Sequence, residues 1–270
     1  MPNLAEALWP AFAGTLRGGH VDLNGRVGIV TGAAVGTGRA VAVALARRGC
    51  DVIVNYSKSA AEAEATAGAC RELGVRALAI QADVADDGAV RAMVARCVAE
   101  LGRVDVLVNN AGTTAFIAHD DMESVTDAVW ERVFGVNLKG PFHCIRAALP
   151  ELRRTGGAIV NVSSVAGVYA IGSSLPYIAS KGALNLMTVA LARALAPEVR
   201  VNCVAPGFVD TRWWQETPIY EHVKSMALEK SLVKKVCTPD DVARLIIEFA
   251  CNDLVTGQVL VVDGGMGIPR

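Results

Sequence analysis

Three polar residues in the second half of the chain have the types and spacing of an acid–base centre. Ser164 stands thirteen residues before Tyr177, and Lys181 follows Tyr177 by four. Residues four apart on a helix share a face, so the lysine ammonium would lie beside the phenol. Two charges about 4 Å apart at an effective dielectric near 20 interact by roughly 4 kcal/mol, which would lower the tyrosine pKa by about three units. The spacing therefore predicts a phenol that exchanges its proton near neutral pH.

A glycine-rich segment earlier in the chain could hold a phosphate group. It reads Thr31-Gly32-Ala33-Ala34-Val35-Gly36-Thr37-Gly38, after an apolar run and before a helical pattern. Glycines let the backbone approach a pyrophosphate closely, and a helix N-terminus offers unpaired N–H groups. Such a string alone is often an ordinary turn. The strand expected before it and the helix expected after it favour a dinucleotide site.

The elements that must position these residues alternate in type along the chain. From Gly25 onward, short β-branched runs alternate with longer helical patterns, which is typical of a parallel sheet covered on both faces. The expected strands are Val27–Val30, Val52–Asn55, Ala77–Gln81, Val106–Asn109, Ala158–Val162, Val201–Val204 and Gln258–Val262. The expected helices are Gly38–Arg48, Ala60–Leu73, Asp87–Leu101, Asp127–Arg154, Pro176–Ala196 and Pro239–Ala250.

This order predicts the α/β class and one doubly wound Rossmann domain. Its seven-stranded parallel sheet would occupy residues 23–270, because no linker or repeat divides the series. Residues 1–22 are expected to form an N-terminal arm, either mobile or in contact with another subunit. In a doubly wound sheet the ligand crevice lies beyond the carboxyl ends of the strands, so chemistry is expected there.

Composition excludes several classes of protein. The chain has 270 residues, 52% hydrophobic and 20% charged, with a net charge of −1. This composition allows a sizeable core and is unlike that of a disordered chain. A near-neutral charge argues against a nucleic-acid partner and against binding to an acidic membrane surface. No apolar run reaches the roughly 18 residues that a membrane span requires.

The cysteines and histidines show no metal or disulfide pattern. Seven widely spaced cysteines include no CxxC, which indicates buried reduced thiols and a cytoplasmic location. His119, His143 and His222 lack ligand spacing, so no metal is expected.

The glycine-rich segment resembles the TGxxxGxG motif of the classical short-chain dehydrogenase/reductase family. Three further motifs of that family follow at expected strand ends: Asn109-Asn110-Ala111-Gly112, Pro206-Gly207 and Asp263-Gly264-Gly265. Each motif alone is an unremarkable turn, but together and in order they are specific. The resemblance extends over about residues 23–265 and implies a nicotinamide cofactor.

The resemblance also implies roles for four catalytic residues. Ser164 would hydrogen-bond the substrate oxygen, and Tyr177 would deliver the proton during reduction. Lys181 would hold the nicotinamide ribose and depress the tyrosine pKa. Asn137, within Val136-Asn137-Leu138, matches the member that supports a water-linked proton relay.

Cofactor contacts are implied along the same crevice. The expected contacts are Gly32, Gly36, Thr37, Gly38, Tyr56, Ser57, Lys58, Asp83, Val84, Asn110, Ala111, Gly112, Tyr177, Lys181, Pro206, Gly207 and Thr211. The family position of Asp83 meets the adenine, although this residue could equally cap the following helix. Thr211 matches the residue that contacts the nicotinamide carboxamide, with a plain turn threonine as the alternative.

The end of the second expected strand bears on the choice between NAD and NADP. A carboxylate there would bond the ribose hydroxyls and repel a 2′-phosphate. The chain instead has Ser57 and Lys58, while Asp51 lies at the opposite end of the strand. NADPH is therefore expected, although Lys58 could also be an ordinary solvated lysine. Val35 stands where many NADP-dependent members carry a basic residue.

Residues 208–235 correspond to the segment that covers the substrate in this family. Trp213 and Trp214 could shape a hydrophobic substrate wall or pack against a neighbouring helix. The expected helix Pro176–Ala196 is apolar on nearly every face, which predicts a subunit contact and, by resemblance, a homotetramer.

The function expected is reduction of a small ketone or aldehyde by NADPH, as in 3-oxoacyl-(acyl-carrier-protein) reductases. The alternative is oxidation of a secondary alcohol such as a sugar, polyol or steroid. A noncatalytic NADP-binding sensor is a third reading, against which Ser164, Tyr177 and Lys181 argue.

Overall fold

A seven-stranded parallel sheet forms the centre of the molecule. The computed structural model describes residues 19–268, and its strands run in the order β3-β2-β1-β4-β5-β6-β7. The strands are β1 Val27–Val30, β2 Asp51–Tyr56, β3 Ala77–Gln81, β4 Val106–Asn109, β5 Ala158–Val162, β6 Arg200–Pro206 and β7 Val259–Val262. The expected doubly wound Rossmann fold is confirmed, and β2 and β6 extend past their predicted ends.

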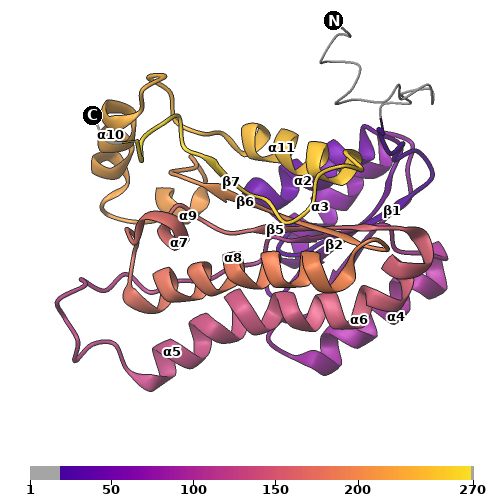
Figure 1. Cartoon of the computed structure of the whole chain (residues 1–270), viewed down its shortest axis with the longest axis horizontal. Helices are drawn as coiled ribbons and strands as arrows, with labels where there is room; N and C mark the ends of the chain where they lie inside the picture. The colour runs from indigo at the N-terminus through magenta and orange to yellow at the C-terminus, as the bar shows by residue number, and fades with distance from the viewer. Residues whose placement is uncertain (1–18, 269–270) are drawn as a thin grey trace, which may run out of the picture.

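Helices cover both faces of the sheet (Figure 1). On one face lie α2 Gly36–Ala46, α3 Ala60–Arg71 and α11 Pro239–Cys251. On the other lie α4 Asp87–Leu101, α6 Gly140–Thr155 and α8 Leu175–Leu195. None of the helices within residues 19–268 is long and apolar enough to span a bilayer.

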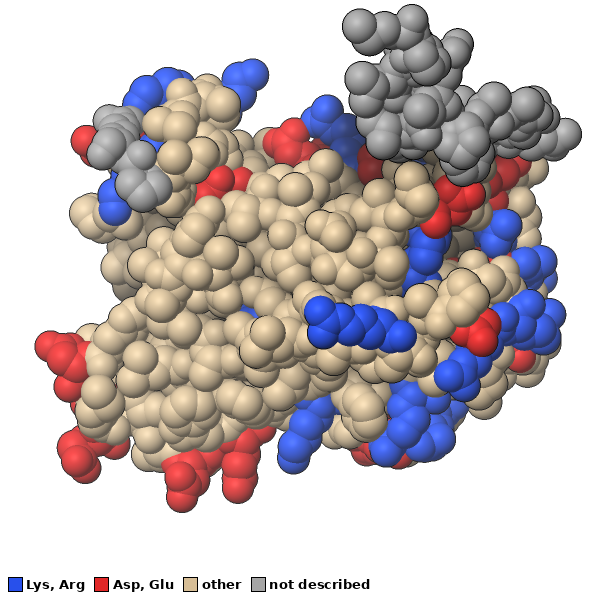
Figure 2. Space-filling view, viewed as in Figure 1, with Lys and Arg blue, Asp and Glu red and all other residues tan. Residues whose placement is uncertain are grey.

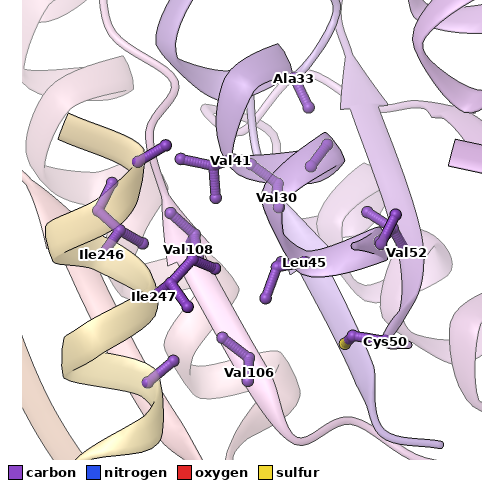
Figure 3. Close-up of a cluster of buried hydrophobic side chains, with 14 of the residues drawn as sticks. Val30, Ala33, Val41, Leu45, Cys50, Val52, Val106, Val108, Ile246 and Ile247 are labelled. Carbon is purple, nitrogen blue, oxygen red and sulfur yellow. The ribbon is translucent and has the colours of Figure 1, made fainter. Parts of the chain in front are cut away.

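Alternation along the strands builds the two cores. On β1, Val27 and Ile29 contribute to the core under α4, α6 and α8, whereas Val30 contributes to the core under α2 and α11. This is the two-residue period of an extended strand. Figure 3 shows the second of these cores, with Leu45 of α2 and Ile246 of α11 directed toward the strands. All seven cysteines are free thiols, and six are buried.

The predicted helix Asp127–Arg154 is three consecutive elements. These are α5 Asp127–Phe134, a π-helical turn η1 Gly135–Lys139, and α6. The apolar periodicity runs through all three, which is why the sequence pattern merges them. Gly140 lies against Val84, where a Cβ would be 2.7 Å from the valine Cγ2. The wider turn lets the helix pass close to the loop after β3, and it places Asn137 inside the protein.

Three short helices were not predicted. They are α7 Ala166–Tyr169, α9 Arg212–Gln215 and α10 Tyr220–Lys230. The first two are only four residues long, and α10 has little apolar periodicity. Helices α9 and α10 lie together at one end of the molecule, within the 208–235 segment (Figure 1).

Only the last residues of the expected N-terminal arm fall within the described chain. The Val21 N–H donates to the Cys251 carbonyl at 2.6 Å, and His20 forms an antiparallel bridge with Asn252. Residues 1–18 lie outside the described range.

Candidate active site

One cavity of about 970 Å³ extends from the glycine-rich segment to α8 and the 208–235 segment. It lies beyond the carboxyl ends of the strands, where a doubly wound sheet binds its ligand. The predicted residues that line it are Gly32, Gly36, Thr37, Gly38, Ser57, Lys58, Asp83, Val84, Asn110, Ala111, Gly112, Ser164, Tyr177, Lys181, Pro206, Gly207 and Thr211. Two others, Tyr56 and Asn137, are not among the lining residues.

The glycine-rich segment forms a cradle with an open helix end. Gly36 has φ +57°, a left-handed conformation that favours glycine. A Cβ on Gly38 would lie 2.3 Å from the Gly32 carbonyl oxygen, so only glycine fits there. Helix α2 begins at Gly36, and its N-cap residue Val35 offers no side-chain cap. The first-turn N–H groups of α2 therefore need another acceptor, and a phosphate supplies one.

Buried amides hold this segment in place. The Gly32 N–H donates to Asn55 Oδ1 at 3.2 Å, and Asn55 Nδ2 donates to the Ala82 carbonyl at 3.0 Å. Asn110 Nδ2 donates to the Thr31 and Gly32 carbonyls at 2.9 and 3.1 Å. The loops after β1, β2, β3 and β4 are thereby fixed to one another.

The residues after β2 are polar and exposed. Ser57 and Lys58 both line the cavity, and Gln81 Nε2 donates to the Ser57 carbonyl at 2.9 Å. Asp51 lies at the other end of β2 and bonds Arg76, with Oδ2 2.6 Å from Nη2. The predicted separation of Asp51 from the crevice is therefore correct. Tyr56 is half-buried and packs against the core instead of facing the cavity.

Asp83 does not cap α4, so that alternative is wrong. The cap is Asp86, which accepts from the Ala89 N–H at 3.1 Å. Asp83 accepts from the Ala85 N–H at 2.9 Å and stays exposed at the cavity edge. Val84 beside it is buried, and its carbonyl is hydrogen-bonded to His143 Nδ1 at 3.0 Å.

Ser164, Tyr177 and Lys181 meet at the end of β5. The Ser164 Oγ accepts from the Ala166 N–H at 3.1 Å and is hydrogen-bonded to the Tyr177 side chain. Helix α8 begins after Ser174, whose Oγ accepts from the Tyr177 N–H at 3.4 Å. One turn later, Lys181 is 4% exposed, and its Nζ lies 5.8 Å from the centroid of the Tyr177 ring.

The pKa of Tyr177 is shifted upward, whereas the sequence predicted a downward shift. Burial raises the pKa of Tyr177, and the hydrogen bond from Ser164 lowers it only in part. Burial also lowers the pKa of Lys181 to about 8. One N–H of the ammonium donates to the Val162 carbonyl at 2.8 Å. Desolvation outweighs the charge effect that the spacing suggested.

Asn137 links the loop after β4 to helix α8 through hydrogen bonds. Its Oδ1 accepts from the Thr113 N–H at 2.8 Å, and its Nδ2 donates to the Thr113 carbonyl at 2.9 Å and to Ser180 Oγ at 3.0 Å. The side chain is fully buried. Its carboxamide therefore fixes the loop after β4 against α8, and its part in a proton relay remains a prediction.

The 208–235 segment is held together around Asp210. This carboxylate accepts from Gln215 Nε2 at 3.1 Å, from the Tyr220 hydroxyl at 2.8 Å and from Lys224 Nζ at 2.6 Å. These bonds keep the pKa of Asp210 below its usual value. Thr211, next along the chain, lies against Gly36, since a Cβ there would be 3.5 Å from its Cγ2. The segment thus contacts the glycine-rich cradle.

Several lining residues were missed by sequence reasoning. They are Phe116, Arg132, Ile171 and Ser173, among others. Phe116 follows the Asn109–Gly112 motif by only four residues, so its proximity could have been inferred. The others lie in loops or on helices whose orientation no periodic pattern reveals. Arg132 donates to Thr113 Oγ1 at 3.3 Å and to the Thr114 carbonyl at 2.9 Å.

No group of three or more His, Cys, Asp or Glu residues within positions 19–268 is arranged to hold a metal ion. Two histidines have other partners: His119 Nε2 is hydrogen-bonded to the Gly172 carbonyl, and His143 to Val84. Tyr177 and Lys181 are among the ionisable residues that line the cavity.

Comparison with known proteins identifies the family. Residues 26–221 match the short chain dehydrogenase family. The chain is 41% identical to the protein named as ketoacyl reductase 2 of the granaticin polyketide synthase of Streptomyces violaceoruber, over 88% of this chain and 95% of that protein. It is 37% identical to the 3-oxoacyl-(acyl-carrier-protein) reductase FabG of Staphylococcus aureus, over 88% of this chain and 96% of that protein.

Solved structures agree. A short-chain dehydrogenase/reductase from Burkholderia xenovorans superposes with a TM-score of 0.85 at 36% identity, over 90% of this chain and 98% of that one. A short-chain alcohol dehydrogenase from Sinorhizobium meliloti gives 0.83 at 34% identity, over 91% of this chain and 97% of that one. The chain belongs to the short-chain dehydrogenase/reductase family and is an oxidoreductase of that family.

Proposed function

We propose that the protein is an NADPH-dependent carbonyl reductase that converts a ketone or aldehyde, including a 3-oxoacyl thioester, into an alcohol. The observation that carries this proposal is the position of Ser164, Tyr177 and Lys181 in the middle of one cavity. The glycine-rich cradle occupies one end of that cavity, and the 208–235 segment closes the other.

The residues present fit a nicotinamide dinucleotide. The bare N-terminus of α2 and the space that a Cβ on Gly38 would fill suit a pyrophosphate, and the family implies NAD or NADP. When bound, the reduced cofactor supplies a hydride to the carbonyl carbon; with one proton, the ketone becomes the alcohol and the cofactor is oxidised. Lys181 and Thr211 would hold its nicotinamide half, and Asp83 and Val84 its adenine half.

Side chains of the protein would bind and protonate the carbonyl oxygen of the substrate. Ser164 would donate a hydrogen bond to the substrate carbonyl, and Tyr177 would pass its proton to the oxygen as negative charge develops there. A donor must carry its proton at working pH, and burial of Tyr177 ensures this by raising its pKa. Solvent then restores the proton to the phenol.

The same pKa direction favours reduction over the alternative of alcohol oxidation. Oxidation needs a phenolate to accept the alcohol proton, and burial disfavours that phenolate. A noncatalytic sensor would need neither the buried ammonium of Lys181 nor a protonated phenol beside Ser164. A sensor would therefore leave these features of the site without a role, whereas oxidation would use the same residues in reverse.

NADPH is preferred in this proposal because of the residues after β2. Ser57 and Lys58 line the cavity, whereas Asp51 is turned away and bound to Arg76. A lysine attracts a 2′-phosphate, and a carboxylate at this position would repel it.

The proposed enzyme also associates with copies of itself, with the 208–235 segment as its substrate lid. Leu186 on α8 is 74% exposed and Phe142 on α6 is 43% exposed. Figure 2 shows that the face carrying α8 is largely uncharged. Covering these side chains would favour a homotetramer, and light scattering that finds only monomer at micromolar concentration would exclude it. A cytoplasmic location is part of the same proposal, with which the free thiols agree.

The function is tested by following reduced-nicotinamide absorbance with a panel of ketones, 3-oxoacyl thioesters, quinones and sugars. We expect loss of NADPH absorbance with at least one carbonyl compound and formation of its alcohol. Turnover restricted to alcohols with NADP⁺, or turnover with neither class, would overturn the proposal.

A further inference from the structure

Large apolar side chains stand exposed in the wall of the cavity beyond Tyr177. Phe116 is 48% exposed, Ile171 49% and Trp213 38%, and all three line the cavity. Exposed apolar groups of this size in a concave site mark the place where a ligand is bound. A bound ligand would bury these side chains, and this burial would stabilise the complex.

Two tryptophans bring aromatic rings to this wall. The Trp213 ring centroid lies 6.2 Å from that of Tyr177 at an interplanar angle of 49°. Trp214 meets Phe116 edge-on, with centroids 5.6 Å apart, and lies 5.7 Å from the buried ring of Phe208. Trp214 is thus held by two other rings, whereas Trp213 faces the tyrosine that would donate the proton.

The charged groups near this wall are unsuited to a sugar or polyol. Two N–H groups of Arg132 are bonded to the Thr113 hydroxyl and the Thr114 carbonyl, and Lys230 is exposed. The lid side of the wall includes the apolar side chains Trp213, Trp214, Ile219, Val223 and Met226, and its charged residue Arg212 is paired with Glu62 and Glu216. A polyhydroxylated substrate would leave its hydroxyls unpaired against these side chains, which is unfavourable.

We propose that the substrate carries its carbonyl on an aromatic or fused-ring system, and that Trp213 selects it by stacking on that ring. This inference rests on the proposed function and names the substrate class. A rigid ring buries apolar area while losing few rotatable bonds, and an aromatic pair adds a stacking interaction beyond that burial. A linear chain of equal size gains the burial but not the stacking, and loses more conformational entropy.

The test compares two ketones with the same number of carbon atoms, 2-tetralone and 2-decanone, each reduced by NADPH. We expect kcat/KM to favour the fused-ring ketone at least about tenfold, which corresponds to about 1.4 kcal/mol. Trp213→Ala should lower kcat/KM for both ketones, because both lose buried area, and should lower it several-fold more for 2-tetralone, which also loses the stacking; Trp213→Phe should retain most of the preference. Trp130→Ala, which removes a tryptophan on α5 that packs against Phe134, is the matched control and should change kcat/KM for neither ketone.

A binding measurement separates this inference from the proposed function. The Tyr177→Phe variant, saturated with NADP⁺, is titrated with each ketone while tryptophan fluorescence is followed. Tighter binding of 2-tetralone, lost in the Trp213→Ala double variant, supports the inference even if no ketone is reduced, in which case only the proposed function fails. Equal or weaker binding of 2-tetralone, or an equal loss for both ketones on Trp213→Ala, overturns the inference.

Discussion

The Lys181 ammonium donates a 2.8 Å hydrogen bond to the Val162 carbonyl at the end of β5. This bond joins helix α8, which carries Tyr177 and Lys181, to the strand that leads to Ser164. It also holds the buried Lys181 ammonium in a defined place in the wall of the cavity.

Activity should fall as the pH rises through about 8. Burial lowers the pKa of Lys181 to about 8, so its charge is present below that pH and lost above it. We expect the affinity for NADPH and kcat/KM to decline together above this value. A pH profile of both quantities checks this, with the Lys181→Met variant as the control, which should show low activity and no such decline. A wild-type profile that is flat from pH 7 to 10 would contradict the role of the ammonium.

Reversing the charge at Lys58 should reverse the cofactor preference. In Lys58→Glu, a carboxylate would stand where a 2′-phosphate is expected and would repel it. We expect the ratio of kcat/KM for NADPH to that for NADH to fall by about 10- to 100-fold, since a few kcal/mol of charge interaction is exchanged. Lys139→Glu, an exposed lysine outside the cavity, should leave the ratio unchanged. An unchanged ratio in Lys58→Glu would show that this lysine is merely solvated.

Removing the Asp210 carboxylate should loosen the lid. Asp210→Ala leaves Gln215, Tyr220 and Lys224 without their common acceptor. Because these groups are partly exposed, we expect the free energy of unfolding to change by about 1 kcal/mol or less. The KM for the ketone should rise several-fold, while the Kd for NADPH should change little. Asp240→Ala on α11 is the control, and equal KM values for the two variants would refute a lid function for this network.

Truncating a core leucine should destabilise the sheet and its helices. Leu45 is fully buried between α2, α11 and the strands, as Figure 3 shows. Leu45→Ala should lower the free energy of unfolding by about 2–5 kcal/mol. Leu254→Ala removes the same atoms from a side chain that is 91% exposed and should change it by less than about 0.5 kcal/mol. Denaturant titration measures both values, and a similar loss in the two variants would argue against the described core.

Much of the fold followed from the sequence because its strands are short, apolar and separated by helical patterns. Val106–Asn109 and Ala158–Val162 were predicted to the residue. The same patterns did not predict how the helices are divided or how they pack. The π-helical turn at Asn137 was hidden by continuous apolar periodicity, and α10 was missed because its pattern is weak.

The candidate site was also predicted only in part from the sequence. Spacing and motifs brought together the glycine-rich segment and Tyr177, because each follows a strand end or starts a helix. The direction of the tyrosine pKa was wrong, because spacing says nothing about desolvation or about the Val162 carbonyl that engages Lys181. Phe116 was missed because a loop places it, and no repeat of residue types marks a loop. Arg132 was missed because the sequence does not show which side of α5 faces the cavity.

The account depends most on Tyr177 as the proton donor. The direct measurement is a single-turnover reaction in which enzyme loaded with NADPH is mixed with a ketone substrate, and both NADPH loss and alcohol formation are recorded. We predict one alcohol per NADPH oxidised in the wild type, and a rate lowered by about 10²–10⁴-fold in Tyr177→Phe, with unchanged NADPH affinity. Wild-type rates of alcohol formation in Tyr177→Phe would contradict the account.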